Sequence, residues 1–462
     1  MRPLRSPAAR GLALAALLLL GSCGGGGGGG GGGPSLTYAT PVLLARQGVA
    51  ITPDLPVTGG AAATSFTVAP ALPTGLLLDP ASGAISGTPL APAATGTYTV
   101  SAMVGGSAAS APVTVQVTPP LPATFTSLEP GFHVETVLTG GPVVLTKMAF
   151  APDGRLFFNE LTTGNVRVID AGGALVATPV ATMAVVTGVE QGLLGLALSP
   201  TFATDGYLYV YASVNVGGPG GDRNRLVRWT VGANNVAASP LVLVDNLPIG
   251  STGHNGGDVE FGPDGLIYVT VGDTGDSNTS QDPLSLAGRV LRYTPAGAIP
   301  ATNPIAGSPE YCRGLRNTFD LCFHPVTGGL FGAENGPTVN DEINFIQAGR
   351  NYLWPADPGG VLTGYRIKLY PEVIAPTSIA FYTAAPFGAE YANNLFIGGY
   401  VNADIRRLKL SGAAFTDVDY EQPFAGLVNV GLFNKPIHLL VGPEGALYVS
   451  TVDSIYRIKK YP

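Results

Sequence analysis

The sequence predicts an all-β protein in which a small β-sandwich precedes a six-bladed β-propeller. The 462 residues include 65 glycines and 40 prolines, yet 45% are hydrophobic, a composition typical of many short buried strands separated by turns. Apolar and polar residues alternate without a helical period. In the second part of the chain one turn-and-strand phrase recurs six times, and a chain of this length is expected to form at least two domains.

The first 22 residues are expected to be a bacterial lipoprotein signal peptide. Arg2 and Arg5 precede the apolar stretch Gly11–Leu20, which is too short to span a membrane as a mature helix. Leu20-Gly21-Ser22-Cys23 resembles the lipobox, in which the cysteine carries the lipid. The alternative is an ordinary secretory signal with an incidental cysteine.

The predicted location is the bacterial cell envelope, facing the periplasm or the cell exterior. Residues 23–34, the lipidated Cys23 and an unbroken glycine run, form a flexible tether, so the membrane is contacted only through the lipid. A net charge of −7 and the absence of any basic run beyond Arg406-Arg407 and Lys459-Lys460 exclude a nucleic-acid partner.

Residues 35–118 are predicted to form the sandwich. Alternating runs such as Thr64–Val68, Thr97–Ser101 and Val113–Val117 are separated by Gly/Pro turns. The segment resembles the bacterial Ig-like module of cadherin type that is common on surface proteins. It contains no histidine or cysteine, so a spacer or adhesion role is expected rather than chemistry.

Residues 119–124 form a proline-rich linker, and residues 125–462 are predicted to form the propeller. The six copies of the repeated phrase begin at Pro152, Asp205, Pro263, Pro325, Ala392 and Pro443. They are about 50 to 65 residues apart, enough for a four-stranded sheet with its loops. The strand Phe132–Leu138, ahead of the first copy, is expected to join the last blade and close the ring.

Three loops of the propeller carry residues suited to catalysis. The first contains His254, followed by Asp273 beyond the next strand; the second contains Arg316; the third contains the turn Gly336-Pro337. A histidine beside a carboxylate can accept a proton at neutral pH, and an arginine can stabilise a developing oxyanion. Backbone carbonyls at a Gly-Pro turn suit a hard cation such as calcium. Without further support, His254 could equally be an ordinary surface-loop histidine.

The two cysteines beyond Cys23 are Cys312 and Cys322, ten residues apart. In an exported chain we expect them to form a disulfide that staples a loop between neighbouring strands. The alternative is a pair of free buried thiols.

Six groups of motifs between Phe132 and Tyr461 resemble, in order, those of the glucose/sorbosone dehydrogenase family. They are Glu190–Ala197; His254–Gly257; Gly262–Gly265 with Gly272-Asp273; Gln281–Pro283 with Ala287–Arg292; Gly314–Asn317; and Asn335–Pro337 with Asp341–Asn344 and Asn351–Pro355. The family is typified by soluble aldose dehydrogenases that use pyrroloquinoline quinone (PQQ) and fold as six-bladed propellers.

The resemblance implies a role for individual residues. His254 takes the position of the general base that removes the proton of the sugar hydroxyl, and Asp273 that of its supporting carboxylate. Arg316 matches the arginine that polarises the quinone and substrate oxygens. Residues implied to bind the cofactor are Glu190, Asn317, Asn335 and Lys435. Those implied to bind calcium are Gly336 and Pro337 at the quinone, and Glu342 and Tyr352 at a second, structural ion.

The chain departs from the family at two positions, 401 and 435, that are expected to bind the carboxylates of PQQ and that we call the cofactor clamp. Val401 stands where a lysine is expected, and Lys435 where an arginine is expected, which keeps a cation but loses the bidentate fork. Because PQQ is a tricarboxylate, each lost charged hydrogen bond should cost roughly 1.5 to 3 kcal/mol of binding. Arg406 is placed to compensate.

Two functions follow as alternatives. The first is an exported, lipid-anchored quinoprotein dehydrogenase that uses PQQ and Ca²⁺, oxidises an aldose or related sugar and passes electrons to an external acceptor. The second is a non-catalytic surface propeller that binds glycan or protein, with the Ig-like module as its stalk. His133, His324 and Trp354 are expected to be packing residues, while His438 is open to either interpretation.

Overall fold

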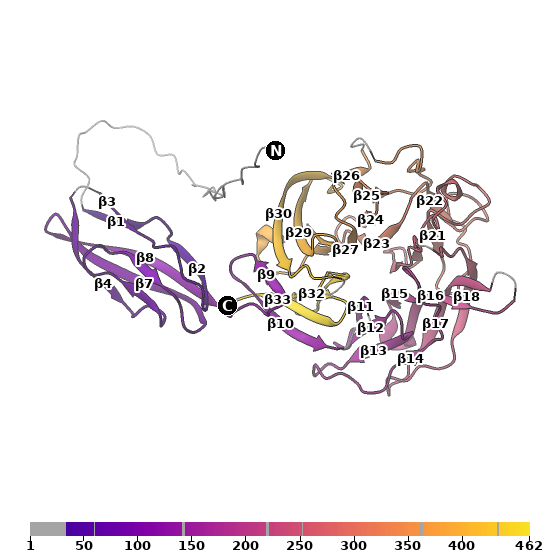
Figure 1. Cartoon of the computed structure of the whole chain (residues 1–462), viewed down its shortest axis with the longest axis horizontal. Helices are drawn as coiled ribbons and strands as arrows, with labels where there is room; N and C mark the ends of the chain where they lie inside the picture. The colour runs from indigo at the N-terminus through magenta and orange to yellow at the C-terminus, as the bar shows by residue number, and fades with distance from the viewer. Residues whose placement is uncertain are drawn as a thin grey trace, which may run out of the picture.

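The computed structural model describes residues 34–462, except for 60, 141–143, 219–220, 252, 360–363 and 432–433. The described chain is almost entirely β-structure and forms a sandwich beside a ring of sheets, which confirms the predicted fold class (Figure 1). Its helical turns are short: α1 (Phe202–Asp205), η1 (Ser277–Ser280) and η2 (Ala389–Tyr391). No helix among the described residues is long and apolar enough to cross a membrane. The predicted signal peptide, Cys23 and the glycine tether lie outside the described residues.

The sandwich is built from eight strands in three sheets, ordered β2-β8-β7-β4, β1-β3 and β5-β6. Its strands are β1 (Ser35–Tyr38), β2 (Val42–Arg46), β3 (Pro56–Gly59), β4 (Ala63–Ala69), β5 (Leu76–Leu78), β6 (Ile85–Gly87), β7 (Ala93–Val104) and β8 (Ser107–Thr118). Val113, Val115 and Val117 of β8 are fully buried on one face, as the alternation in the sequence predicts.

The described propeller residues form six sheets, which are numbered here in the order in which β11, β15, β19, β23, β27 and β31 occur in the chain. The first holds β11 (Leu145–Phe150), β12 (Leu156–Glu160), β13 (Asn165–Ile169) and β14 (Ala181–Thr182), and the second β15 (Leu193–Leu198), β16 (Tyr207–Asn215), β17 (Asp222–Thr230) and β18 (Leu241–Leu247). The third holds β19 (Val259–Phe261), β20 (Ile267–Val271), β21 (Arg289–Tyr293) and β22 (Glu310–Arg313), and the fourth β23 (Thr318–Phe323), β24 (Leu330–Glu334), β25 (Asp341–Ile346) and β26 (Arg366–Tyr370). The fifth holds β27 (Pro376–Tyr382), β28 (Asn394–Gly399), β29 (Asp404–Ser411), β30 (Asp417–Leu427) and β9 (Phe125–Leu128), and the sixth β31 (His438–Val441), β32 (Leu447–Ser450), β33 (Ser454–Lys460) and β10 (Phe132–Thr139).

The repeated phrase in the sequence is the turn between the first and second strand of each sheet. Its glycine adopts a left-handed backbone, with φ of 89° at Gly154, 74° at Gly265 and 79° at Gly445. In the third sheet, Gly265 N donates to Gly262 O at 2.9 Å, and Gly262 N donates to Leu266 O at 2.9 Å. The turn is therefore encoded locally, which is why it is visible in the sequence.

Strand β10 closes the ring as predicted. It pairs antiparallel with β33, with Phe132 opposite Lys460 and Val134 opposite Ile458. The first strands of consecutive sheets contact one another around the ring, and β31 of the last sheet contacts β11 of the first. The first strand of every sheet in the ring is thus held between the first strands of its two neighbours.

The propeller begins with β9, which adds a fifth strand to the fifth sheet through Ala425 opposite Leu128. The sandwich also contacts the propeller directly, since Gln116 Nε2 donates to Tyr461 O at 2.8 Å. The two domains are therefore joined by side-chain contacts as well as by the linker.

A small cavity of about 20 Å³ is lined by a buried ionic group that we call the Lys147 cluster, made of Lys147, Asp258 and Asp320. Lys147 Nζ, on β11, lies 2.5 Å from Oδ1 of each aspartate. Asp258 immediately precedes β19, and Asp320 lies on β23, where its Oδ2 accepts from Ser378 Oγ at 2.8 Å. Through Ser378, which lies on β27, the cluster connects segments of four sheets, and Gly256 of the His254 loop lines the same cavity.

The predicted disulfide is wrong: Cys312 and Cys322 are both free. Cys312 lies on β22, the outermost strand of the third sheet, opposite Val290. Cys322 lies on β23, the first strand of the fourth sheet, opposite Phe331. The ten-residue spacing between the cysteines leads from the last strand of one sheet to the first strand of the next, so the two thiols lie in different sheets.

Candidate active site

His254 lies in the loop that leads from β18 into β19, among glycines that let this backbone turn sharply. Its own φ is 57°, a conformation that is unfavourable for a residue with a side chain. The backbone is held there because His254 N donates to Glu190 Oε2 at 2.7 Å. A Cβ added at Gly256 would lie 2.9 Å from Thr270 O, so glycine is needed beside the histidine.

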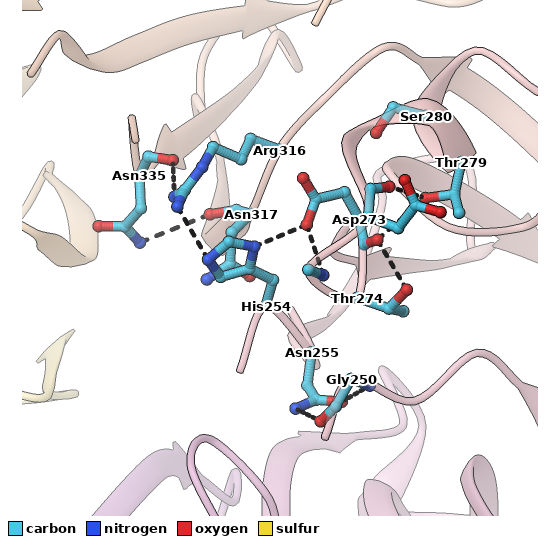
Figure 2. A network of polar contacts seen from close by, with 12 residues as sticks. Gly250, His254, Asn255, Asp273, Thr274, Thr279, Ser280, Arg316, Asn317 and Asn335 are labelled. Atoms are coloured by element: carbon cyan, nitrogen blue, oxygen red, sulfur yellow. Dashed lines mark hydrogen bonds and ion pairs between the residues drawn. The ribbon is translucent and has the colours of Figure 1, made fainter. Parts of the chain in front are cut away.

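The imidazole of His254 is hydrogen-bonded to Asp273, which follows β20 (Figure 2). His254 Nδ1 lies 2.6 Å from Asp273 Oδ1, and Gly275 N also donates to that oxygen at 2.9 Å. Asp273 is only 2% exposed, and burial alone would raise its pKa. The hydrogen bonds from His254, Gly275 and Trp354 outweigh burial and lower the pKa of this carboxyl. His254 and Asp273 are therefore brought together as predicted.

Arg316 approaches the other side of the imidazole. Its Nη2 lies 2.9 Å from His254 Nε2, and its Nη1 donates to Asn335 O at 2.9 Å (Figure 2). A guanidinium can only donate hydrogen bonds, so Nε2 must be the acceptor and the ring proton must be on Nδ1, facing Asp273. In this arrangement Nε2 is the ring nitrogen that presents a lone pair.

Glu190, Asn317 and Asn335, which the sequence assigns to the cofactor, hold the loops of the site to one another. Asn317 Nδ2 donates to Glu190 Oε2 at 3.1 Å, and Asn317 Oδ1 accepts from Gly256 N at 3.1 Å. Asn335 contributes its carbonyl to Arg316. These hydrogen bonds therefore hold the loops that carry His254 and Arg316 in place.

Sequence reasoning missed the role of Glu334. Its Oε1 accepts from the backbone N–H groups of Arg316 and Asn317, each at 2.7 Å, and its Oε2 accepts from Thr318 Oγ1. Burial raises the pKa of the Glu334 carboxyl to about 7. Its position directly before Asn335-Gly336-Pro337 was the available signal, since the carboxylate fixes the loop that carries Arg316.

Trp354 also belongs to the site, contrary to the prediction that it only packs. Its Nε1 donates to Asp273 Oδ2 at 2.9 Å, and Arg316 Cζ lies 5.7 Å from the indole centroid. The other three histidines do lie elsewhere. His133 pairs with Glu135, and His324 stacks on Phe415. His438 is buried beside the cavity of the Lys147 cluster, where its Nδ1 accepts from Met148 N.

The proposed calcium residues line a small cavity of about 20 Å³ next to Arg316. No described N–H group donates to the carbonyls of Gly336 or Pro337, and the buried Oδ1 of Asn344 has no hydrogen-bond partner among the described residues. These oxygens suit a hard cation. Within the described part of the chain there is no cluster of three or more His, Cys, Asp or Glu side chains that could hold a metal.

The side chains expected at the second calcium site already have protein partners. Glu342 Oε1 lies 2.9 Å from Arg366 Nε, and Glu342 Oε2 accepts from Asn344 Nδ2 at 2.8 Å. Tyr352 Oη donates to Phe345 O at 2.6 Å. Neither Glu342 nor Tyr352 presents a free side-chain ligand here.

At the cofactor clamp, Lys435 is the available cation. Its Nζ lies 4.5 Å from the ring centroid of Tyr400, and no described carboxylate pairs with it. Arg406 does not compensate for Val401, because it is paired with Asp404 at 3.0 Å and with Glu421 at 3.2 Å. Val401 itself is 41% exposed.

Comparison with known proteins assigns each of the two domains to a family. Residues 144–458 match the "Glucose / Sorbosone dehydrogenase" family model, and residues 33–118 match that of the "Putative Ig domain". The aldose sugar dehydrogenase YliI of Escherichia coli (strain K12) is 27% identical over 335 residues, 68% of this chain and 88% of that protein.

Two solved structures share the fold. An oxidoreductase of Thermus thermophilus, described as a glucose dehydrogenase, is 32% identical with a TM-score of 0.61, covering 71% of this chain and 99% of its own. The PQQ-bound aldose sugar dehydrogenase of Streptomyces coelicolor is 28% identical with a TM-score of 0.60, covering 74% of this chain and 99% of its own. The chain belongs to the glucose/sorbosone dehydrogenase family of sugar-oxidising enzymes.

Proposed function

We propose that this protein is an exported, PQQ-dependent dehydrogenase that oxidises the anomeric hydroxyl of an aldose or a related sugar hydroxyl and delivers the electrons to an external acceptor. The observation that carries the proposal is the placement of His254, with Nδ1 2.6 Å from Asp273 Oδ1 and Nε2 2.9 Å from Arg316 Nη2. A base oriented in this way, next to a cation, suits removal of a hydroxyl proton as the adjacent carbon loses hydride.

The donors present fit a quinone tricarboxylate and a calcium ion. Arg316 supplies positive charge, as does Lys435, which pairs with no described carboxylate. The carbonyls of Gly336 and Pro337, to which no described N–H group donates, suit a hard cation. When bound, PQQ would supply the two-electron acceptor that no side chain of this protein provides. The clamp has fewer cations than the family pattern because of Val401, so weaker quinone binding is expected.

The residues of the chain would divide the chemistry between them. The guanidinium of Arg316 now fills the position at His254 Nε2 that a substrate hydroxyl would take, so the arginine has to give way as the sugar binds. His254 Nε2 then takes the hydroxyl proton, Asp273 stabilises the resulting imidazolium, and Arg316 stabilises the developing negative charge on oxygen. Glu190 and Glu334 keep the backbone of the two loops in place.

The proposed location is the cell envelope, with Cys23 as the lipid anchor. The lipobox-like sequence before Cys23 and the glycine run after it support this placement. The sandwich would act as a spacer that carries the propeller away from the membrane surface.

The test is sugar-dependent reduction of an artificial electron acceptor after purified protein is supplied with PQQ and Ca²⁺. We expect His254→Gln to lower kcat by about 10²- to 10⁴-fold, the usual contribution of a general base. His133→Gln is the matched control, because His133 lies on β10 and pairs with Glu135 away from the site. A protein that neither binds the quinone nor reduces the acceptor would refute the proposal and favour a non-catalytic binding propeller.

A further inference from the structure

Trp354 contacts the side chains of both residues that flank the imidazole of His254. It follows β25, in a loop held on both sides, since Trp354 N donates to Gly314 O at 2.9 Å and Trp354 O accepts from Gln281 Nε2 at 2.7 Å. The half-buried indole donates through Nε1 to Asp273 Oδ2 at 2.9 Å. Its ring lies 5.7 Å from Arg316 Cζ, within cation–π range.

We propose that Trp354 is a positioning residue that fixes the Asp273 carboxylate with its indole N–H and the Arg316 guanidinium with its ring. The inference rests on the proposed function for its kinetic consequences. Its structural content is independent of that function, because it concerns contacts within the protein alone.

The two carboxylate oxygens of Asp273 have different hydrogen-bond partners. Oδ1 already accepts from His254 Nδ1 and Gly275 N, while Trp354 is the only described donor to Oδ2. The terminal torsion of an aspartate is soft, so a carboxylate held at one oxygen can rotate. Asp273 is 2% exposed, and an Oδ2 without a donor would be left in a desolvated position. Loss of the indole N–H should therefore make the carboxylate rotate, and the imidazole bonded to Oδ1 should tilt with it.

The same ring acts on the arginine. Arg316 donates to Asn335 O and to His254 Nε2, and the second of these bonds would be lost when a substrate hydroxyl takes its place. An aromatic face beneath the cation favours one resting orientation. Both described polar partners of the His254 ring nitrogens are other residues, so the effect of Trp354 on the reaction is indirect.

The kinetic test uses Trp354→Phe, which keeps an aromatic ring and removes the N–H. We expect kcat to fall about 10- to 100-fold while KM for the sugar changes by less than about two-fold, because orientation rather than substrate affinity is lost. The matched control is Trp229→Phe. Trp229 is buried in the core of the second sheet and is the only other tryptophan of the chain, so this variant should keep kcat within about two-fold.

Coupling to Asp273 separates positioning from a general loss of packing. In an Asp273→Asn background, Trp354→Phe should cost less than about two-fold more, because the partner of the N–H has already been changed. The inference would be overturned if the fold loss in kcat of the double variant equalled the product of the two single losses. It would also be overturned if Trp354→Phe left kcat unchanged.

A spectroscopic test needs no activity. The chain has two indole N–H groups, and Trp229→Phe leaves only the signal of Trp354 in a ¹H–¹⁵N spectrum. We expect that signal to exchange slowly with solvent and to shift in Asp273→Asn. A protein without sugar oxidation that retains this Asp273-dependent signal would refute the proposed function and support the inference. An indole signal indifferent to Asp273→Asn would overturn the inference, whether or not the enzyme is active.

Discussion

Replacing Lys147 with methionine should destabilise the propeller more than any exposed charge substitution. Lys147 is 5% exposed, and its ammonium lies between two aspartates that are themselves almost fully buried. Methionine retains most of the side-chain volume but leaves Asp258 and Asp320 without a counter-charge. Breaking a buried ion pair by removing one partner typically costs about 3–5 kcal/mol of unfolding free energy.

The size of the loss should depend on pH. Burial raises the pKa of the Asp320 carboxyl to about 6, although Lys147 pulls it down. A carboxyl with a folded pKa above its unfolded value binds the proton more tightly in the folded state, so it costs stability as pH rises from about 4 to about 6. Without Lys147 that pKa rises further, and protonation relieves the uncompensated charge. We expect the loss in Lys147→Met to be smaller at pH 5 than at pH 8.

The measurement is urea unfolding followed by tryptophan fluorescence, which reports on the propeller because both Trp229 and Trp354 lie in it. The matched control is Lys368→Met. Lys368 pairs with Glu421 at 2.6 Å but its side chain is 28% exposed, and a pair of that kind contributes less than about 1 kcal/mol. Equal losses in the two variants, or a loss in Lys147→Met that is the same at both pH values, would refute the reasoning.

Two further predictions concern the two cysteines and Glu190. Cys312 and Cys322 should both be alkylated in urea without reductant, and the melting temperature should be the same with and without dithiothreitol; a reductant-dependent melting temperature would restore the disulfide. Glu190→Ala should lower kcat/KM for the sugar by about 10- to 100-fold through release of the strained His254 backbone, and quinone affinity should change much less; the reverse pattern would return Glu190 to the cofactor.

Features of the fold that are encoded locally could be predicted from the sequence. The six turns were visible because each depends on a few adjacent residues, such as the left-handed Gly265 after Pro263-Asp264. The closing strand was visible because Phe132–Leu138 has the pattern of a buried strand and precedes the first turn. His254 and Asp273 were paired correctly because they flank one antiparallel hairpin, β19 and β20, whose two ends lie side by side.

Features that depend on contacts between sheets could not be predicted. The disulfide failed because spacing along the chain does not reveal that Cys312 and Cys322 belong to different sheets. Lys147 was overlooked because its aspartates come from two other sheets, more than a hundred residues away. Trp354 was assigned to packing because an aromatic side chain is usually buried for its area, and only the structure shows its N–H directed at Asp273.

The pairing of β10 with β33 has a consequence for biosynthesis. Glu135 and Arg457, which face each other across this pair, are 322 residues apart in the chain. At about 5–20 residues per second, a ribosome needs roughly tens of seconds to deliver the second strand after the first has emerged. Throughout that time the edge of β10 is unpaired and the sixth sheet cannot form. A strand edge left open for so long is a site for misassembly, so the chain would benefit from a chaperone that covers β10 until translation ends.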